Sequence, residues 1–222
     1  MIFSDLVSLT IAFTYVAAII GIAEILRRGF HLPVEFTRKF VHVGVGMSAL
    51  VVTIVFRTWY IAVIGPIVFI LLNYLSFKYQ LFQGIETGLK GQKGTIYFPL
   101  AFAILIPLLW SQPEILGVSM MPLTWGDTAA ALLGARFGMH KFSFFRQTSS
   151  VEGSLAMFLF SLIATCSALF IFGASFGFSM FLATATAFVA TLAEMFSPWG
   201  IDNLTVPLVS ALVLAALNGW SK

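Results

Sequence analysis

The residue least expected in its surroundings is Asp127, in the stretch TWGDTAAALLGARFGMHKF at 124–142. Its neighbours are mostly apolar or small, and a charge placed in hydrocarbon is costly, so intramembrane acids usually face a polar cavity or a protein partner. We therefore expect Asp127 to bind a metal or to act as a catalytic carboxylate. The alternative is a structural aspartate that is hydrogen-bonded to a neighbouring helix. Pro122 is expected to loosen the helix just before it.

Four further acids fall at the ends of apolar segments: Glu24, Glu152, Glu194 and Asp202. Mg²⁺ favours a few carboxylates together with phosphate oxygens and water. We expect a magnesium site whose ligands are Asp127, Glu152 and Asp202. Two simpler interpretations stay open: Glu152 favours the positive end of a helix dipole, and Asn203 is a helix N-cap.

Basic residues supply the complementary charge. The cluster Arg38-Lys39-x-x-His42 enters an apolar segment, and Arg38 and His42, four apart, would share one helix face. A charge at the mouth of a site with a histidine one turn deeper suits phosphate binding or proton transfer. Alternatively, Arg38 and Lys39 anchor the topology and His42 is a satisfied polar residue.

Two glycine patterns suit a nucleotide less specifically. GLKGQKGT, at 88–95, precedes an apolar helix and resembles backbone that binds phosphate at a helix N-terminus, but its spacing is not that of a P-loop and a flexible loop explains it as well. Gly126, Ala130, Gly134 and Gly138 recur every four residues. This column favours close helix contact over approach of a nucleotide to the backbone.

The elements that must position these residues are membrane helices. Hydrophobic residues make up 59% and charged residues 9% of the 222, whereas a soluble domain carries roughly a quarter charged residues. The apolar runs are continuous and do not alternate as barrel strands do. We predict an all-α, polytopic membrane protein with about seven or eight transmembrane helices in one integral membrane domain, 1–222. The first apolar run lacks signal-peptide features and is expected to be permanent. The single cysteine, Cys166, excludes an internal disulfide.

The predicted spans are 5–26, 40–56, 58–76, 95–110, 115–136, 152–172, 175–196 and 203–220. The break between the second and third is marked only by residues 57–60, and the break between the sixth and seventh only by 173–177. Ten basic residues fall on one side of this arrangement: Arg27, Arg28, Arg38, Lys39, Lys78, Lys90, Lys93, Arg136, Lys141 and Arg146. The other side has Arg57 and Lys222. The positive-inside rule places the ten in the cytoplasm and both termini outside. The loops rich in polar groups then converge on the cytoplasmic face, where nucleotides are available.

An ordered series of short motifs resembles the CTP-dependent polyprenol kinase family, which includes dolichol, phytol and farnesol kinases and the fungal CTP-dependent diacylglycerol kinase. The series runs from Glu24 through RKFVH at 38–42, KGTIYFPLA at 93–101, GDTAAALLGARFG at 126–138, VEGSLAMF at 151–158 and IDNLTVPL at 201–208. The resemblance covers most of the chain. It implies an all-helical membrane fold related to the CTP-using cytidylyltransferases, and transfer of the CTP γ-phosphoryl group to a lipid alcohol with a divalent metal.

The resemblance implies catalytic roles for Asp127, Glu152 and His42. It implies nucleotide or phosphate binding by Arg38, Lys39, Lys93, Gly94, Gly126, Gly134, Gly138, Lys141, Arg146, Gly153, Ser154 and Asn203. Ser149 stands where the family often has a lysine, and Lys141 or Arg146 is expected to supply that charge. The expected partners are a nucleotide and a lipid alcohol from the bilayer, such as phytol, farnesol, geranylgeraniol or dolichol, with no nucleic acid. The oligomeric state is open, a dimer included.

Four rival functions remain. A CTP-dependent diacylglycerol kinase would differ only in its acceptor. A phosphatidate or archaeol cytidylyltransferase commonly carries a late histidine-glycine-aspartate-arginine signature, whereas this chain has GIDNLTVP at 200–207. A small ion-coupled transporter would use Asp127 for coupling but should show an inverted repeat and polarity spread through the membrane depth. A structural protein predicts no clustering of acids.

Overall fold

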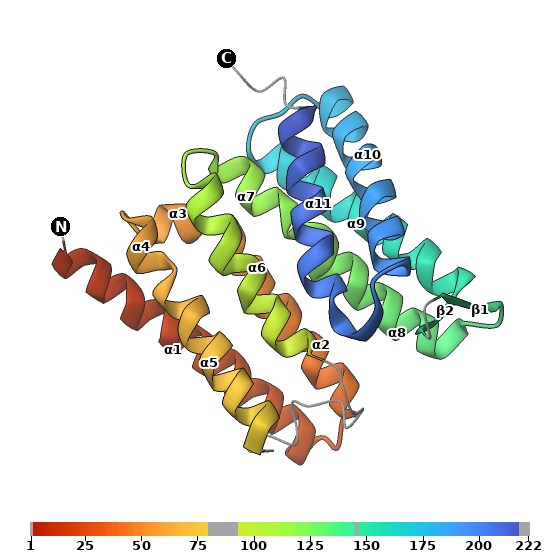
Figure 1. Cartoon of the computed structure of the whole chain (residues 1–222), viewed down its shortest axis with the longest axis horizontal. Helices are drawn as coiled ribbons and strands as arrows, with labels where there is room; N and C mark the ends of the chain where they lie inside the picture. Colours follow the sequence, from red (N-terminus) through yellow and green to blue (C-terminus); the bar gives the residue numbers. More distant parts are fainter. Residues whose placement is uncertain (1, 80–92, 145–146, 218–222) are drawn as a thin grey trace.

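A computed structural model describes residues 2–79, 93–144 and 147–217 (Figure 1). Within this part of the chain, helices form at every predicted apolar segment. The helices are α1 (Ile2–Gly29), α2 (Val34–Met47), α3 (Val52–Val55), α4 (Trp59–Ala62), α5 (Ile64–Tyr79), α6 (Gly94–Leu109), α7 (Pro113–Ser119), α8 (Thr128–Phe137), α9 (Val151–Ile171), α10 (Phe176–Met195) and α11 (Asp202–Ala216). A two-stranded antiparallel hairpin, β1 (Lys141–Phe144) and β2 (Gln147–Ser150), joins α8 to α9.

The predicted helical membrane class is confirmed. Among the described residues, four stretches are long and apolar enough to cross a bilayer: Ser4–Gly29, Trp59–Ser76, Val151–Ile171 and Phe176–Met195. The shorter apolar helices α6 and α11 accompany them. That all eight apolar segments cross the membrane stays a prediction, as does the orientation.

Both weak breaks predicted from the sequence are present. The helical stretch of the second segment ends at Val55 and α4 begins at Trp59. Asp5 of α1 stabilises this break, because its carboxylate accepts hydrogen bonds from the Arg57 backbone N–H (2.9 Å) and the Thr58 hydroxyl (2.7 Å). The other break lies between α9 and α10, where Gly173 has a φ of 89°, a conformation that favours glycine.

The helices pack as neighbours across the molecule. Helix α1 packs on α2, α5 on α6, α6 on α11, α11 on α10, and α10 on α9 (Figure 1). Exposed leucines and isoleucines line the outer helices α1 and α5, among them Leu6, Ile11 and Leu71. Such faces are stable against lipid and costly in water. These outer helices therefore belong against the bilayer.

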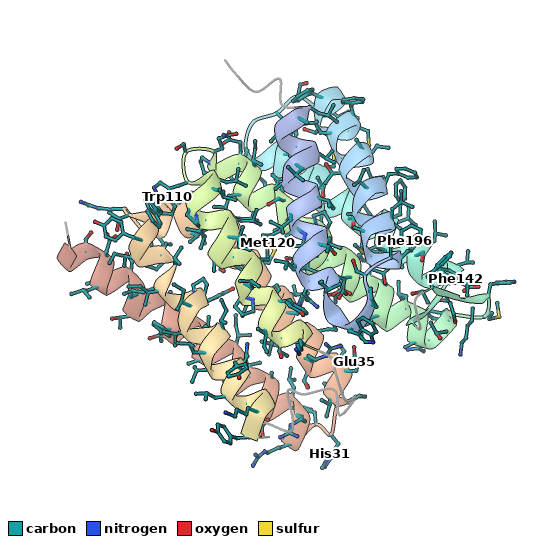
Figure 2. All side chains as sticks on the ribbon, in the orientation of Figure 1. His31, Glu35, Trp110, Met120, Phe142 and Phe196 are labelled. Atoms are coloured by element: carbon teal, nitrogen blue, oxygen red, sulfur yellow. The ribbon has the colours of Figure 1, made fainter. Side chains whose placement is uncertain are left out.

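The core surrounds one continuous segment made of α7, the π-helix Pro122–Asp127 and α8. Leu116, Met120 and Leu123 of this segment are fully buried, and Met120 lies in the middle of the bundle in Figure 2. The segment contacts α2, α9, α10 and α11. Asp127, at its centre, is consequently enclosed by protein and does not face lipid.

Candidate functional site

The centre of the site is a buried ion pair between Lys39 and Asp127. The Lys39 ammonium nitrogen lies 2.6 Å from Oδ2 of Asp127, and the two side chains are only 7% and 8% exposed. The ammonium also lies 3.4 Å from the Asp127 backbone oxygen. Removing two charges from water is costly unless the pair is close and hydrogen-bonded. This contact therefore satisfies the intramembrane aspartate and fixes its orientation.

The π-helix positions Asp127. It begins at Pro122 and ends at Asp127, in the place where the sequence predicted a loosened helix. Proline lacks the N–H that an α-helix requires, and single π-turns inside α-helices are frequent at functional sites. Gly46 of α2 allows close approach, because a Cβ there would overlap Thr124 of this turn.

His42 completes this cluster from the next turn of α2. Its Nε2 lies 3.1 Å from the Leu123 carbonyl oxygen and 3.6 Å from Oδ2 of Asp127. Its ring packs against Phe98 of α6, with centroids 4.3 Å apart. The spacing of three between Lys39 and His42 places both against the π-helix.

Arg38 has a different environment from the one the sequence suggested. Its guanidinium pairs with Glu35 of the same helix at 2.6 Å, while its buried Nε has no hydrogen-bond partner in the part of the chain that the structure describes. Its charge interacts electrostatically with Asp127, but Lys39 makes the direct contact.

A second part of the site is the junction of the N-termini of α6 and α11. The Lys93 backbone N–H donates to the Trp199 carbonyl at 3.3 Å, and a Cβ on Gly94 would lie 2.8 Å from Nδ2 of Asn203. Gly200, with a φ of 81°, turns the chain so that its backbone touches Gly94. Asn203 donates to the Gly200 carbonyl at 3.2 Å. The predicted phosphate-binding residues Lys93, Gly94 and Asn203 are therefore brought together.

Three acids approach the Lys39 charge from different helices. Asp202 begins α11 and Glu194 lies in the last turn of α10, and each is 9% exposed. Glu194 interacts electrostatically with Asp127, Asp202 and Lys39, and Asp202 with Asp127 and Lys39. Glu194 is not among the ligands that the sequence predicted. The sequence feature that could have identified Glu194 is its place at the end of an apolar run, eight residues before Asp202.

Glu152 lies outside this group. It sits beyond the C-terminus of α8, whose ten residues separate it from Asp127 by about 15 Å of helical rise. Its carboxylate is 2.6 Å from Nδ1 of His140 and accepts hydrogen bonds from the backbone N–H groups of Met139 and His140. Among the described residues, no group of three histidines, cysteines or acids could hold a metal. The predicted set of Asp127, Glu152 and Asp202 therefore does not form a closed metal site.

The predicted glycines lie at the contact between α8 and α9. A Cβ on Gly126 would lie 2.8 Å from the Met157 sulfur, and one on Gly134 would lie 3.3 Å from the Gly153 Cα. A Cβ on Gly138 would meet the Ser150 side chain, whose hydroxyl caps α9 by accepting from the Gly153 N–H at 3.1 Å. This geometry favours the helix-packing interpretation of the column.

The remaining predicted residues lie apart from the ion pair. Lys141 is exposed on β1, opposite Ser150. The Ser154 hydroxyl is buried and has no hydrogen-bond partner within residues 2–79, 93–144 and 147–217. Arg146, and the part of the glycine-rich loop at 88–92, lie outside the described residues. Their proposed roles stay predictions.

The chain is 32% identical over 212 residues to the phytol kinase of Synechocystis sp., a match covering 93% of this chain and 90% of the relative. The chain belongs to the polyprenol kinase family. It is also 25% identical over 212 residues to a probable chloroplastic phytol kinase of Glycine max, covering 86% of the chain and 69% of the relative. A probable chloroplastic phytol kinase of Oryza sativa is 28% identical over 138 residues, covering 59% of the chain and 44% of the relative.

No family model matches the chain, and no solved structure matches it. The family assignment therefore depends on the curated relatives and agrees with the ordered motifs. The match to the Synechocystis protein leaves 7% of the chain outside it. Lys39 and Asn203 are each separated from the nearer end of the chain by more than 7% of its length. The match therefore includes all residues from Lys39 to Asn203, and with them the whole site.

Proposed function

We propose that this protein is a membrane-embedded kinase that transfers the γ-phosphoryl group of a nucleoside triphosphate, CTP in the first instance, to a prenyl alcohol such as phytol. The observation that carries the proposal is that a match to a phytol kinase along almost the whole chain contains a buried site in which Lys39, His42 and three acids converge. Phosphoryl transfer depends mainly on positioning and on stabilising the charge of the phosphates, and this site offers both charges in an enclosed environment.

Each part of the site has a role in this reaction. Lys39 and the neighbouring Arg38 supply positive charge for phosphate oxygens, and the junction of Lys93, Gly94 and Asn203 lies at the positive N-terminal end of α6. Asp127, held by Lys39, faces the same space and accepts the proton of the alcohol or binds the metal. His42 fixes the π-turn through the Leu123 carbonyl.

A divalent metal such as Mg²⁺ fits an open site here. Mg²⁺ is commonly bound by one or two carboxylates, with substrate phosphates and water completing its coordination. Asp127 and Asp202 are buried carboxylates whose charges interact, which suits such a site even though no closed set of ligands is present among the described residues. The metal would neutralise charge on the phosphates as they transfer.

The acceptor enters from the bilayer in this proposal. A prenyl alcohol has a long apolar tail and one hydroxyl, and the outer helices expose apolar side chains suited to lipid. The related proteins are named as phytol kinases, so phytol is the first acceptor to test. By the distribution of basic residues, the site faces the cytoplasm and the termini lie on the other side.

The test is a transfer assay with purified protein in detergent and Mg²⁺. γ-Labelled CTP, ATP and UTP are each offered with phytol, farnesol, geranylgeraniol, dolichol and diacylglycerol. We expect labelled phytyl monophosphate, formed fastest from CTP. Asp127→Asn should abolish it, whereas the matched variant Glu114→Gln, an acid in the first turn of α7, should not. Label that passes only from α-labelled CTP to phosphatidate would instead identify a cytidylyltransferase, and the absence of any product would refute the proposal.

A further inference from the structure

Glu194 is a buried acid that the mechanism above does not use. It lies in the last turn of α10 and is 9% exposed, and its Oε2 has no hydrogen-bond partner among the described residues. Buried polar atoms are nearly always hydrogen-bonded, and an unpaired carboxylate in a low-dielectric interior is costly. The free oxygen therefore requires a ligand or a proton.

The neighbours of Glu194 identify the kind of ligand. Its carboxylate interacts with those of Asp127 and Asp202 and with the ammonium of Lys39. Lys39 is paired at 2.6 Å with Asp127. The ion pairs of the described residues do not include Glu194 or Asp202. The Asp202 carboxylate lies 3.5 Å from the Asn203 side-chain amide and interacts with backbone N–H groups at the start of α11.

Lys39 compensates Asp127, and the carboxyl groups of Glu194 and Asp202 at the ends of α10 and α11 remain without an ion-pair partner among the described residues. A divalent cation that displaces the protons of both groups would meet two hard oxygen ligands enclosed by protein, and their combined charge would match its own. The short turn of residues 196–201 connects the end of α10 to the start of α11, so the two acids lie at the two ends of one connection.

We propose that Glu194 and Asp202 jointly bind the divalent cation, and that Glu152 takes no part in binding it. The role of the bound cation rests on the proposed kinase function. Binding of the cation can be measured whether or not the protein is a kinase. Two carboxylates make an open site, which agrees with the absence of a closed group of three ligands among the described residues. Phosphate oxygens and water fill the other positions, so the nucleotide strengthens metal binding.

The test measures metal binding directly with Mn²⁺. The six-line electron paramagnetic resonance signal of free Mn²⁺ disappears on binding and reports the bound fraction for purified protein in detergent. Wild type is expected to bind one Mn²⁺ saturably, and excess Mg²⁺ should displace it. Glu194→Gln and Asp202→Asn should each weaken binding by about tenfold or more, since losing even an outer partner of a metal site costs about that much. Glu152→Gln and Glu114→Gln are the matched controls and should bind as wild type does.

Thermal unfolding gives a second readout. Glu194→Gln should lose the stabilisation that Mn²⁺ gives to wild type, measured for each protein as the unfolding temperature with Mn²⁺ minus that in EDTA. Unchanged Mn²⁺ affinity in Glu194→Gln would overturn the assignment, as would loss of binding in Glu152→Gln. Mn²⁺ binding that depends on Glu194 in a protein without kinase activity would refute the proposed function and leave the cation site standing.

Discussion

The buried pair of Lys39 and Asp127 makes the sharpest prediction about stability. Lys39→Met keeps much of the side-chain volume and removes the charge, which leaves the Asp127 carboxylate without its partner at 2.6 Å. Removing one member of a buried pair typically destabilises by about 3–5 kcal/mol, because the other charge stays buried. For a chain of this size about 1 kcal/mol corresponds to about 2–4 °C, so the unfolding temperature should fall by about 6–20 °C.

The assay is thermal unfolding of the detergent-purified protein, followed by the fluorescence of its tryptophans, in a double-mutant cycle. Asp127→Asn in the Lys39→Met background removes the stranded charge and should recover at least half of the loss. Lys78→Met is the matched control, because Lys78 is exposed at the end of α5 and such changes rarely exceed about 0.5 kcal/mol. Two results would contradict this reasoning. One is an unfolding temperature of Lys39→Met equal to that of Lys78→Met. The other is a coupling energy between Lys39 and Asp127 below about 0.5 kcal/mol.

Three further outcomes are expected. Gly126→Ala should destabilise by about 1–3 kcal/mol through overpacking against α9, whereas Gly65→Ala, which meets nothing within 4 Å, should be neutral or mildly stabilising in the same unfolding assay. Glu152→Gln should retain kinase activity within about fivefold, since the pair of Glu152 with the exposed His140 contributes little. Complete inactivity of this variant would show that Glu152 is catalytic. In a cysteine-free background, Met139→Cys, 80% exposed, should react with a membrane-impermeant maleimide only from the cytoplasmic side and Ser111→Cys only from the outside; the reverse pattern would invert the orientation.

The glycines illustrate how far a pattern reaches. The spacing of Gly126, Gly134 and Gly138 predicted one small-residue face on a helix, and that face is present. Spacing does not state what the face contacts, because a neighbouring helix and a nucleotide both need the absence of a Cβ. The contacts with Met157 and Gly153 of α9 decided for helix packing.

The site acids show the same division more sharply. Composition and continuous apolar runs determined the helical membrane class. Roughly 20 consecutive apolar residues suffice to cross a bilayer as a helix. In hydrocarbon, such a single segment can satisfy its own backbone hydrogen bonds only as a helix. Local chemistry also singled out Asp127, since a charge inside such a run must have a partner. The sequence could not name that partner, because Lys39 is 88 residues away and Arg38 fitted the same pattern.

Only the tertiary structure decided which acids meet. Glu152 follows a conspicuous motif, yet the length of α8 carries it to the far end of that helix, where it pairs with His140. Glu194 has no motif of its own, yet it is buried at the end of α10, where it interacts electrostatically with Asp202 and Asp127. Whether a segment forms a membrane helix follows from its own residues. Which helix ends lie close together depends on how all the helices pack, and most of the site residues come from those ends.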